Sequence, residues 1–280
     1  MIILRKLSHL KEILLQHKEQ HHSVGFVPTM GALHPGHISL VEESVKENDF
    51  TIISVFVNPT QFNNSEDLEK YPRTEEADIK LLSGAGAGVV FFPSIEDIYP
   101  DGQKSGEFDF DDLENQMEGK FRPGHFNGVG TVVKRFFEMI EPDKAYFGEK
   151  DFQQLQIIRQ LVKNENIPVQ IVPVAIKRES DGLAMSSRNM RLNAEMRSEA
   201  ANIFRILNLA KSYFENHSVA ETRKFAIEEF ANTKLNLEYF EIADEETLKP
   251  AKDKHEREHL RAFVAAFAGE IRLIDNLRLI

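Results

Sequence analysis

The strongest constraint on the fold is the regular alternation of short apolar runs with helical patterns in the first half of the chain. Helical patterns occupy Ile38 to Glu47, Thr74 to Leu82, Thr131 to Ile140 and Phe152 to Asn164. Apolar runs typical of buried strands occupy Val24 to Pro28, Phe50 to Val57, Val89 to Phe92, Ala145 to Phe147 and Val169 to Val174. Such alternation predicts an α/β fold with a doubly wound, mostly parallel sheet covered by helices on both faces.

The pattern changes after a polar loop that contains Asp181-Gly182. Two helical stretches follow, and then two strand-like runs, the second of which is broken into a hairpin at Ala268-Gly269. These four segments are Glu195 to Asn216, Val219 to Ala231, Leu235 to Ile242 and Arg261 to Ile274. We therefore predict a large domain of residues 1–176 and a smaller C-terminal α+β domain of residues 177–280.

Composition excludes several classes of function. The 280 residues include no cysteine, which rules out disulfides, thiolate metal sites and cysteine nucleophiles. A net charge of −11 argues against a nucleic-acid-binding surface. No run approaches the ~18 apolar residues of a membrane span, and the apolar start is too short for a signal peptide. We expect a cytoplasmic protein with small-molecule partners, no nucleic acid and no membrane.

The first chemical cluster is a strand that ends in a glycine turn and opens into a helix. Backbone N–H groups and the helix dipole there favour a phosphate. His34 and His37 could instead be metal ligands, although neither an intervening Glu nor a Cys completes a familiar zinc set, or ordinary structural histidines. The strand, turn and helix context favours nucleotide binding. The cluster consists of Met30, Gly31, Ala32, Leu33, His34, Pro35, Gly36 and His37.

The second cluster also leads from a strand through glycine into a helix, and it reads Gly148-Glu149-Lys150-Asp151. Lys150 offers a compact charge for a phosphate and Asp151 can accept from ribose hydroxyls, with Gln154 one turn further on the same face. An ordinary helix start capped by Asp is the alternative. Ligands of open α/β sheets bind at the carboxyl ends of the strands, which places this cluster beside the first.

The third cluster is the polar loop that ends in Met185-Ser186-Ser187-Arg188. Two hydroxyls and a guanidinium can wrap a polyphosphate, and Arg188 can stabilise charge on a departing pyrophosphate. A plain linker is the alternative. Another glycine-rich run, Gly84 to Gly88, precedes a strand instead of following one, so we interpret it as a helix C-cap and turn.

Together, the clusters resemble the nucleotidyltransferase superfamily, whose Rossmann-like fold grips ATP with a His-x-Gly-His motif and a later loop. Here these read His34-Pro-Gly-His37 and Met185-Ser-Ser-Arg188. Within it, the chain is similar to the pantothenate synthetase family. The matching stretches are Pro28 to His37, Ser54 to Phe62, Tyr71 to Thr74, Arg122 to Gly128, Phe147 to Leu155 and Asp181 to Asn189.

The resemblance implies an ATP-dependent condensation of pantoate with β-alanine through a pantoyl adenylate, with AMP and pyrophosphate as products. It implies a homodimer in which residues 177–280 act as a lid. The rivals are an enzyme that leaves the nucleotidyl group on its product, and a noncatalytic RNA-binding or nucleotide-sensing module. AMP as the final product would distinguish the ligase from the first rival. The net charge of −11 weighs against RNA binding by the second.

The resemblance also assigns residues to roles. It implies Mg²⁺, with Asp78 as a candidate to support the ion through water. Lys177 stands where the family often carries a valine that meets the adenine. Gln61 and Gln154 are assigned to pantoate, and Asn58 to the β-alanine and phosphate region. The ATP site comprises Met30 to His37, Gly148 to Asp151, Lys177 and Met185 to Arg188, among which His34, His37, Lys150 and Arg188 are the catalytic candidates.

Overall fold

The computed structural model of the chain describes residues 1–62, 65–255 and 258–280. It divides into two compact units. The first comprises Met1–Glu114, Glu118–Glu149 and Gln154–Ala175, and the second comprises Asn115–Met117, Lys150–Gln153 and Ile176–Ile280.

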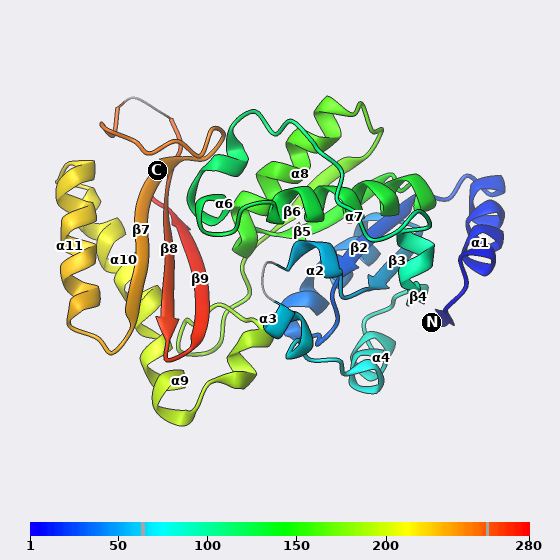
Figure 1. The fold of residues 1–280 in the computed structure, drawn as a ribbon, viewed down its shortest axis with the longest axis horizontal. Helices are drawn as coiled ribbons and strands as arrows, with labels where there is room; N and C mark the ends of the chain where they lie inside the picture. The colour runs from blue at the N-terminus through cyan, green and yellow to red at the C-terminus, as the bar shows by residue number, and fades with distance from the viewer. Residues whose placement is uncertain (63–64, 256–257) are drawn as a thin grey trace. The chain divides into compact units, whose positions relative to one another are not determined.

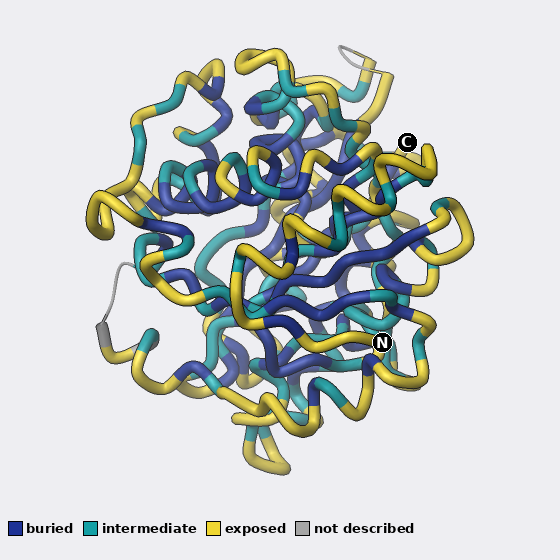
Figure 2. The backbone as a smooth tube through the Cα atoms, turned by 90° about the vertical axis from the view of Figure 1, so that its right-hand side faces the viewer, coloured by how far each residue is buried: buried dark blue, intermediate teal, exposed yellow. Residues whose placement is uncertain are grey.

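The first unit is built on a six-stranded sheet in the order β1-β4-β3-β2-β5-β6, and every neighbouring pair is parallel (Figure 1). The strands β2, β3 and β4 are buried along most of their length, whereas β1 and β6 are largely exposed or half-buried, and Figure 2 shows the buried segments in dark blue. The strands are β1 (Ile2–Leu4), β2 (Val24–Thr29), β3 (Phe50–Val55), β4 (Val89–Phe91), β5 (Lys144–Gly148) and β6 (Gln170–Val174).

Helices cover both faces of this sheet because its central strands are apolar on both sides. Val27 packs with Leu40 and Leu82 of the helices on one face. Phe26, its neighbour in β2, faces Phe136 of a helix on the other, with 5.4 Å between ring centroids. The helices are α1 (Leu7–Glu19), α2 (Pro35–Glu47), α3 (Ser65–Glu69), α4 (Glu75–Ser83), α5 (Ile95–Ile98), α6 (Met117–Phe121), α7 (His125–Ile140) and α8 (Phe152–Asn164), with short 3₁₀ turns η1 (Pro59–Gln61), η2 (Leu113–Asn115) and η3 (Glu149–Asp151).

The second unit packs helices against an antiparallel sheet in the order β7-β8-β9. Its core joins Ile206 and Phe230 of the helices to Phe240 and Val264 of the sheet. The elements are η4 (Ser187–Arg191), α9 (Ala194–Ala200), α10 (Asn202–Phe214), α11 (Val219–Ala231), β7 (Asn236–Asp244), β8 (Leu260–Ala268) and β9 (Ile271–Arg278). The predicted fold class, a parallel α/β sheet with a smaller α+β part, is confirmed.

The differences from the predicted elements have local causes. β1 and α1 were missed because β1 is only three residues long and because Leu10 is the one buried residue of α1, which leaves a weak pattern. α7 begins at His125 instead of Thr131, since packing overrides the low helix propensity of its glycines. The helix predicted from Glu195 is two helices, α9 and α10. Gly84 caps α4 as expected.

Among the helices of the described residues, none is both long enough and apolar enough to span a membrane.

Candidate active site

The first cluster forms the turn between β2 and α2. His34 is the N-cap of α2 and Pro35 is its first residue. The Gly36 N–H donates to Nδ1 of His34 at 3.1 Å, and the His34 N–H donates to Nδ1 of His37 at 3.3 Å. The two rings touch, with centroids 4.1 Å apart. The histidines therefore cap the helix reciprocally.

These hydrogen bonds assign the tautomer of both histidines. Because Nδ1 of each ring accepts from the backbone, the proton of the neutral imidazole lies on Nε2. Both Nε2–H groups are then donors at a helix N-terminus, where the dipole favours negative charge. The structural interpretation and the phosphate-binding interpretation of these histidines are thus compatible, since each ring uses one nitrogen for the cap.

This turn lies at the topological switch point of the sheet. β3 and β4 extend the sheet on one side of β2, and β5 and β6 extend it on the other. Since the strands are parallel, the turn after β2 and Gly148 at the end of β5 share one edge. Open α/β sheets bind their ligands outside the carboxyl ends of the strands at such a point. The topology therefore supports the predicted placement of both segments.

Asp78 of α4 shapes the turn that precedes the histidines. Its carboxylate is 1% exposed and accepts from the N–H groups of Ala32 at 3.0 Å and Leu33 at 2.8 Å. The Thr74 hydroxyl donates to the same carboxylate at 3.1 Å. Ala32 needs this support because its φ of +50° lies in the left-handed region. Both carboxylate oxygens of Asp78 therefore help to hold the turn. The water-mediated contact of Asp78 with Mg²⁺ is a separate role and stays a prediction.

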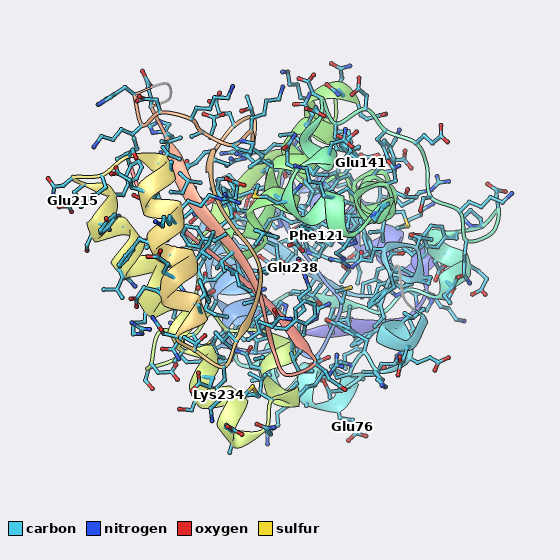
Figure 3. The ribbon with its side chains drawn as sticks, turned by 60° about the vertical axis from the view of Figure 1, so that its left-hand side comes forward. Glu76, Phe121, Glu141, Glu215, Lys234 and Glu238 are labelled. Carbon is cyan, nitrogen blue, oxygen red and sulfur yellow. The ribbon has the colours of Figure 1, made fainter. Side chains whose placement is uncertain are left out.

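Replacing Asp78 with asparagine should destabilise the protein by about 1–3 kcal/mol, because the new Nδ2 donor would meet a backbone donor. Urea unfolding would measure the loss. The matched control is Glu76→Gln on the same helix, where the side chain is exposed and points outward (Figure 3). The control should leave the free energy of unfolding unchanged, and an equally harmless Asp78→Asn would contradict the proposed role.

A buried hydrogen-bond network orients the amide of Gln61. The Tyr99 hydroxyl donates to Oδ1 of Asn58 at 2.5 Å. Nδ2 of Asn58 then donates to the Gly128 carbonyl at 3.1 Å and to Oε1 of Gln61 at 3.2 Å. Burial raises the pKa of Tyr99, which keeps the phenol protonated as a donor. Nε2 of Gln61 is left facing the sulfur of Met30, a weak acceptor that a ligand oxygen would replace.

The segment from Arg122 supports the backbone of Gln61. Nδ1 of the buried His125 lies 2.7 Å from the Gln61 carbonyl, and the Arg122 guanidinium donates to the same oxygen at 3.4 Å. The role of this segment was open from the sequence. Its contacts to η1 make it a support of the candidate site.

The second cluster continues from β5 through η3 into α8. The Lys150 side chain is 17% exposed, and its Nζ lies 3.8 Å from the carboxylate of Asp151. Asp151 is exposed and Gln154 is half-buried. A lysine that pairs only loosely with its neighbour can still turn its charge to an anionic ligand.

The third cluster belongs to a tight turn of the second unit. The Met185 N–H donates to the carbonyl of the exposed Lys177 at 3.0 Å. The Arg188 N–H donates to Oγ of Ser186 at 3.3 Å, and η4 (Ser187–Arg191) follows. Backbone hydrogen bonds therefore fix this segment more firmly than a plain linker.

An ion pair holds the beginning of the same turn. Arg197 donates to the Asp181 carboxylate at 2.6 and 3.3 Å, and this pairing lowers the pKa of Asp181. The Leu183 N–H donates to the same carboxylate at 3.2 Å. The carboxylate thus stays charged and keeps the turn closed.

The predicted site residues divide between the two units. The first unit holds Met30 to His37, Asn58, Gln61, Asp78, Gly148, Glu149 and Gln154, and the second holds Lys150, Asp151, Lys177 and Met185 to Arg188. Within residues 1–62, 65–255 and 258–280, no three His, Cys, Asp or Glu side chains are arranged to hold a metal ion.

Sequence reasoning missed four residues that support these segments, namely Tyr99, Arg178, Asp275 and Asn276. Asp275 and Asn276 are 3% and 2% exposed. Two adjacent polar residues among the aliphatic residues of a strand were a usable signal, because buried polar side chains require partners. Tyr99 and Arg178 gave no comparable signal.

Comparison with known proteins identifies the relatives of the chain. The family model described as pantoate-beta-alanine ligase matches residues 2–278. A pantothenate synthetase of Flavobacterium psychrophilum is 50% identical and aligns over 100% of both chains. One of Christiangramia forsetii is 53% identical over 96% of this chain and 97% of its own.

Solved structures agree with these relatives. Pantothenate synthetase from Thermus thermophilus superposes with a TM-score of 0.92 at 41% identity, covering 100% of this chain and 99% of that one. The Francisella tularensis ligase, complexed with beta-gamma ATP and beta-alanine, has a TM-score of 0.83 at 38% identity over 100% and 98% of the two chains. With the switch-point site and the histidine cap described above, these matches show that the chain belongs to the pantoate-beta-alanine ligase family.

Proposed function

We propose that this protein condenses pantoate with β-alanine in an ATP-dependent reaction that passes through a pantoyl adenylate. The observation that carries the proposal is the reciprocal His34–His37 cap, which sets two Nε2–H donors at the start of α2. The Francisella tularensis relative, described with an ATP compound and β-alanine, supports the same substrates here.

In the first step, a pantoate carboxylate oxygen attacks the α-phosphorus of ATP. The new C–O–P linkage forms as the bond to pyrophosphate breaks. A carboxylate is already a nucleophile at neutral pH, so catalysis consists of positioning and charge stabilisation. We assign the stabilisation to the Nε2–H groups of His34 and His37, the charges of Lys150 and Arg188, and the hydroxyls of Ser186 and Ser187.

In the second step, the amine of β-alanine attacks the acyl carbon of the adenylate. The C–N bond forms, AMP leaves with the electron pair of the broken C–O bond, and the nitrogen loses a proton. Exclusion of water protects the adenylate from hydrolysis. We assign this exclusion to residues 177–280 acting as a lid.

Mg²⁺ enters the proposal only as part of the Mg·ATP substrate, whose phosphates commonly provide its non-water ligands. Among the described residues, no three His, Cys, Asp or Glu side chains gather to hold a metal ion. We keep Asp78 as a candidate to support the ion through water, in addition to the hydrogen bonds that both its oxygens accept.

We assign Gln61 and Gln154 to pantoate and give Asn58 a supporting role. Asn58 is 1% exposed. Both the oxygen and the nitrogen of its side-chain amide form hydrogen bonds with protein groups. It therefore fits a position behind Gln61 better than direct contact with β-alanine. The ATP site keeps the predicted residues, and the exposed Lys177 can meet the adenine through its backbone.

Replacing Gln61 with alanine should raise the KM for pantoate roughly 10- to 100-fold, the cost of one hydrogen-bonding group at a buried site. The KM for ATP and kcat should change less, since the histidine cap is untouched. Steady-state kinetics with each substrate varied would measure both. Gln160→Ala, which removes an amide paired with Asn164 on α8, is the control. A selective rise in the KM for ATP would contradict the assignment.

The function itself is tested by measuring pyrophosphate and AMP release from Mg·ATP and pantoate, with and without β-alanine. We expect sustained release of both products only when all substrates are present. Transfer of the nucleotidyl group to a stable product would favour the first rival enzyme. ATP binding without turnover would favour a sensing module.

We further propose that the protein is a cytoplasmic homodimer, as the family resemblance implies. Light scattering during gel filtration should give twice the chain mass of 32.1 kDa. A single-chain mass at assay concentrations would contradict the dimer.

A further inference from the structure

Asp275 and Asn276 are adjacent polar residues of β9, and both are buried in the second unit. Polar side chains remain buried only where hydrogen bonds replace those lost to water. The partners of this pair lead to the second and third chemical clusters.

Asn276 holds the backbone at Lys150. Its Nδ2 donates to the Lys150 carbonyl at 3.0 Å. Its Oδ1 accepts from the Arg261 guanidinium at 2.6 Å, which fixes the orientation of the amide. The same guanidinium lies 4.0 Å from the ring centroid of Phe152, two residues after Lys150. Asn276 and Arg261 thus fix both ends of the three-residue stretch that carries Lys150 and Asp151.

Asp275 holds the turn that leads to Met185 to Arg188. Arg178 binds its carboxylate through two parallel hydrogen bonds, at 2.6 and 3.0 Å. Burial raises the pKa of the Asp275 carboxyl, and the bidentate pairing with Arg178 opposes that rise. The same guanidinium donates to the Gly182 carbonyl at 3.1 Å, so one arginine connects the strand to the tip of the turn.

The turn fits closely around Arg178. Arg178 pairs with Ala184 across the turn, and its guanidinium lies 3.8 Å from the ring centroid of Phe204. Gly182 has a φ of +90°, and a Cβ there would lie 2.3 Å from the same ring. Only glycine therefore allows this approach. η4, which contains Arg188, also contacts β9.

We propose that Asp275 and Asn276 form one positioning element that sets the spacing between the Lys150 segment and the Met185 to Arg188 segment. The inference rests on the proposed function, because it concerns how two sets of phosphate-contacting groups are held for one ATP. Neighbouring residues of a strand have a fixed separation, so the two segments share a rigid reference. Neither residue is assigned contact with ATP.

The test compares Asn276→Asp and Asp275→Asn, which keep the side-chain shape but remove the donor to Lys150 or the charge that pairs with Arg178. The control is Glu238→Gln (Figure 3), which breaks the ion pair of Glu238 with Arg272 on the same sheet but touches neither segment. Each variant is examined for kcat, the KM of each substrate, thermal unfolding and hydrogen exchange of the backbone amides.

We expect kcat to fall roughly 10- to 100-fold in both variants, as for misplaced catalytic groups, with the KM for pantoate unchanged. Amide exchange should rise at 150–153 in Asn276→Asp and at 177–188 in Asp275→Asn, and at neither in the control. Asn276→Ser, which is too short to reach Lys150, replaces Asn276→Asp if that variant does not fold.

Kinetics and exchange equal to the control would overturn the inference while leaving the ligase function intact. Failure of the wild-type protein to release AMP would instead overturn the proposed function. The exchange pattern still decides the positioning role in that case, because it does not depend on turnover.

Discussion

Replacing His37 with asparagine is expected to lower kcat by about 10²- to 10³-fold, the effect of losing one aligned donor to developing phosphate charge. Asparagine places its Oδ1 near the position of Nδ1, so it can still accept from the His34 N–H at the start of α2. It has no group at the position of Nε2. The variant therefore separates the cap from the chemistry.

The free energy of unfolding of His37→Asn should stay within about 0.5 kcal/mol of the wild type, because the cap survives. Steady-state pyrophosphate release and urea unfolding measure the two quantities. His37→Gln is the reciprocal control, since its amide reaches the Nε2 position and should recover part of kcat. Wild-type turnover in folded His37→Asn would remove His37 from the proposed mechanism.

Replacing Gly128 with alanine is expected to destabilise the protein by about 1–3 kcal/mol and to raise the KM for pantoate, because the site has no room for a methyl group. The added Cβ would lie 2.4 Å from the Thr60 carbonyl oxygen and 2.8 Å from the Gln61 nitrogen. These are backbone atoms, so η1 as a whole would have to move away from α7. The Gly128 carbonyl that binds Asn58 would shift with it.

Thermal unfolding and pantoate kinetics would check Gly128→Ala. Gly84→Ala is the matched control, since its added Cβ has 3.9 Å to the nearest atom and Gly84 has a right-handed conformation. This control should be neutral or slightly stabilising. An unchanged unfolding temperature in Gly128→Ala would contradict this prediction, because it would mean that η1 can move away from α7 at little energetic cost.

Local sequence patterns predicted the elements that are buried on both faces. The boundaries of β2 and β3 came within one or two residues because these strands are continuous apolar runs. The apolar run of the edge strand β1 is only three residues long, which is too short to identify a strand. Periodic patterns arise where one face of an element is buried and the other meets water, and a strand of three residues such as β1 is too short to show one.

The chemical clusters could be predicted from the sequence because each is contiguous in the chain. The residues that support these clusters lie far away in the sequence. Asp78 follows Leu33 by 45 residues, and Asn276 follows Lys150 by 126 residues. The local sequence can mark Asn276 as a buried polar residue that needs a partner, but it does not indicate that the partner is the Lys150 carbonyl. The tautomer of His37 likewise required the position of the His34 N–H. The motifs therefore located the candidate site, but the contacts that support it became known only from the structure.

The position of Asp275 and Asn276 in β9 has a consequence for fragments of the chain. A ribosome makes β2, α2 and the Lys150 segment long before it reaches β9. A product broken off before residue 271 has every motif that we propose to contact ATP, yet it lacks the two side chains that hold Lys150 and Arg178 in place. Interrupted synthesis thus yields copies that contain these motifs without the residues that position two of them.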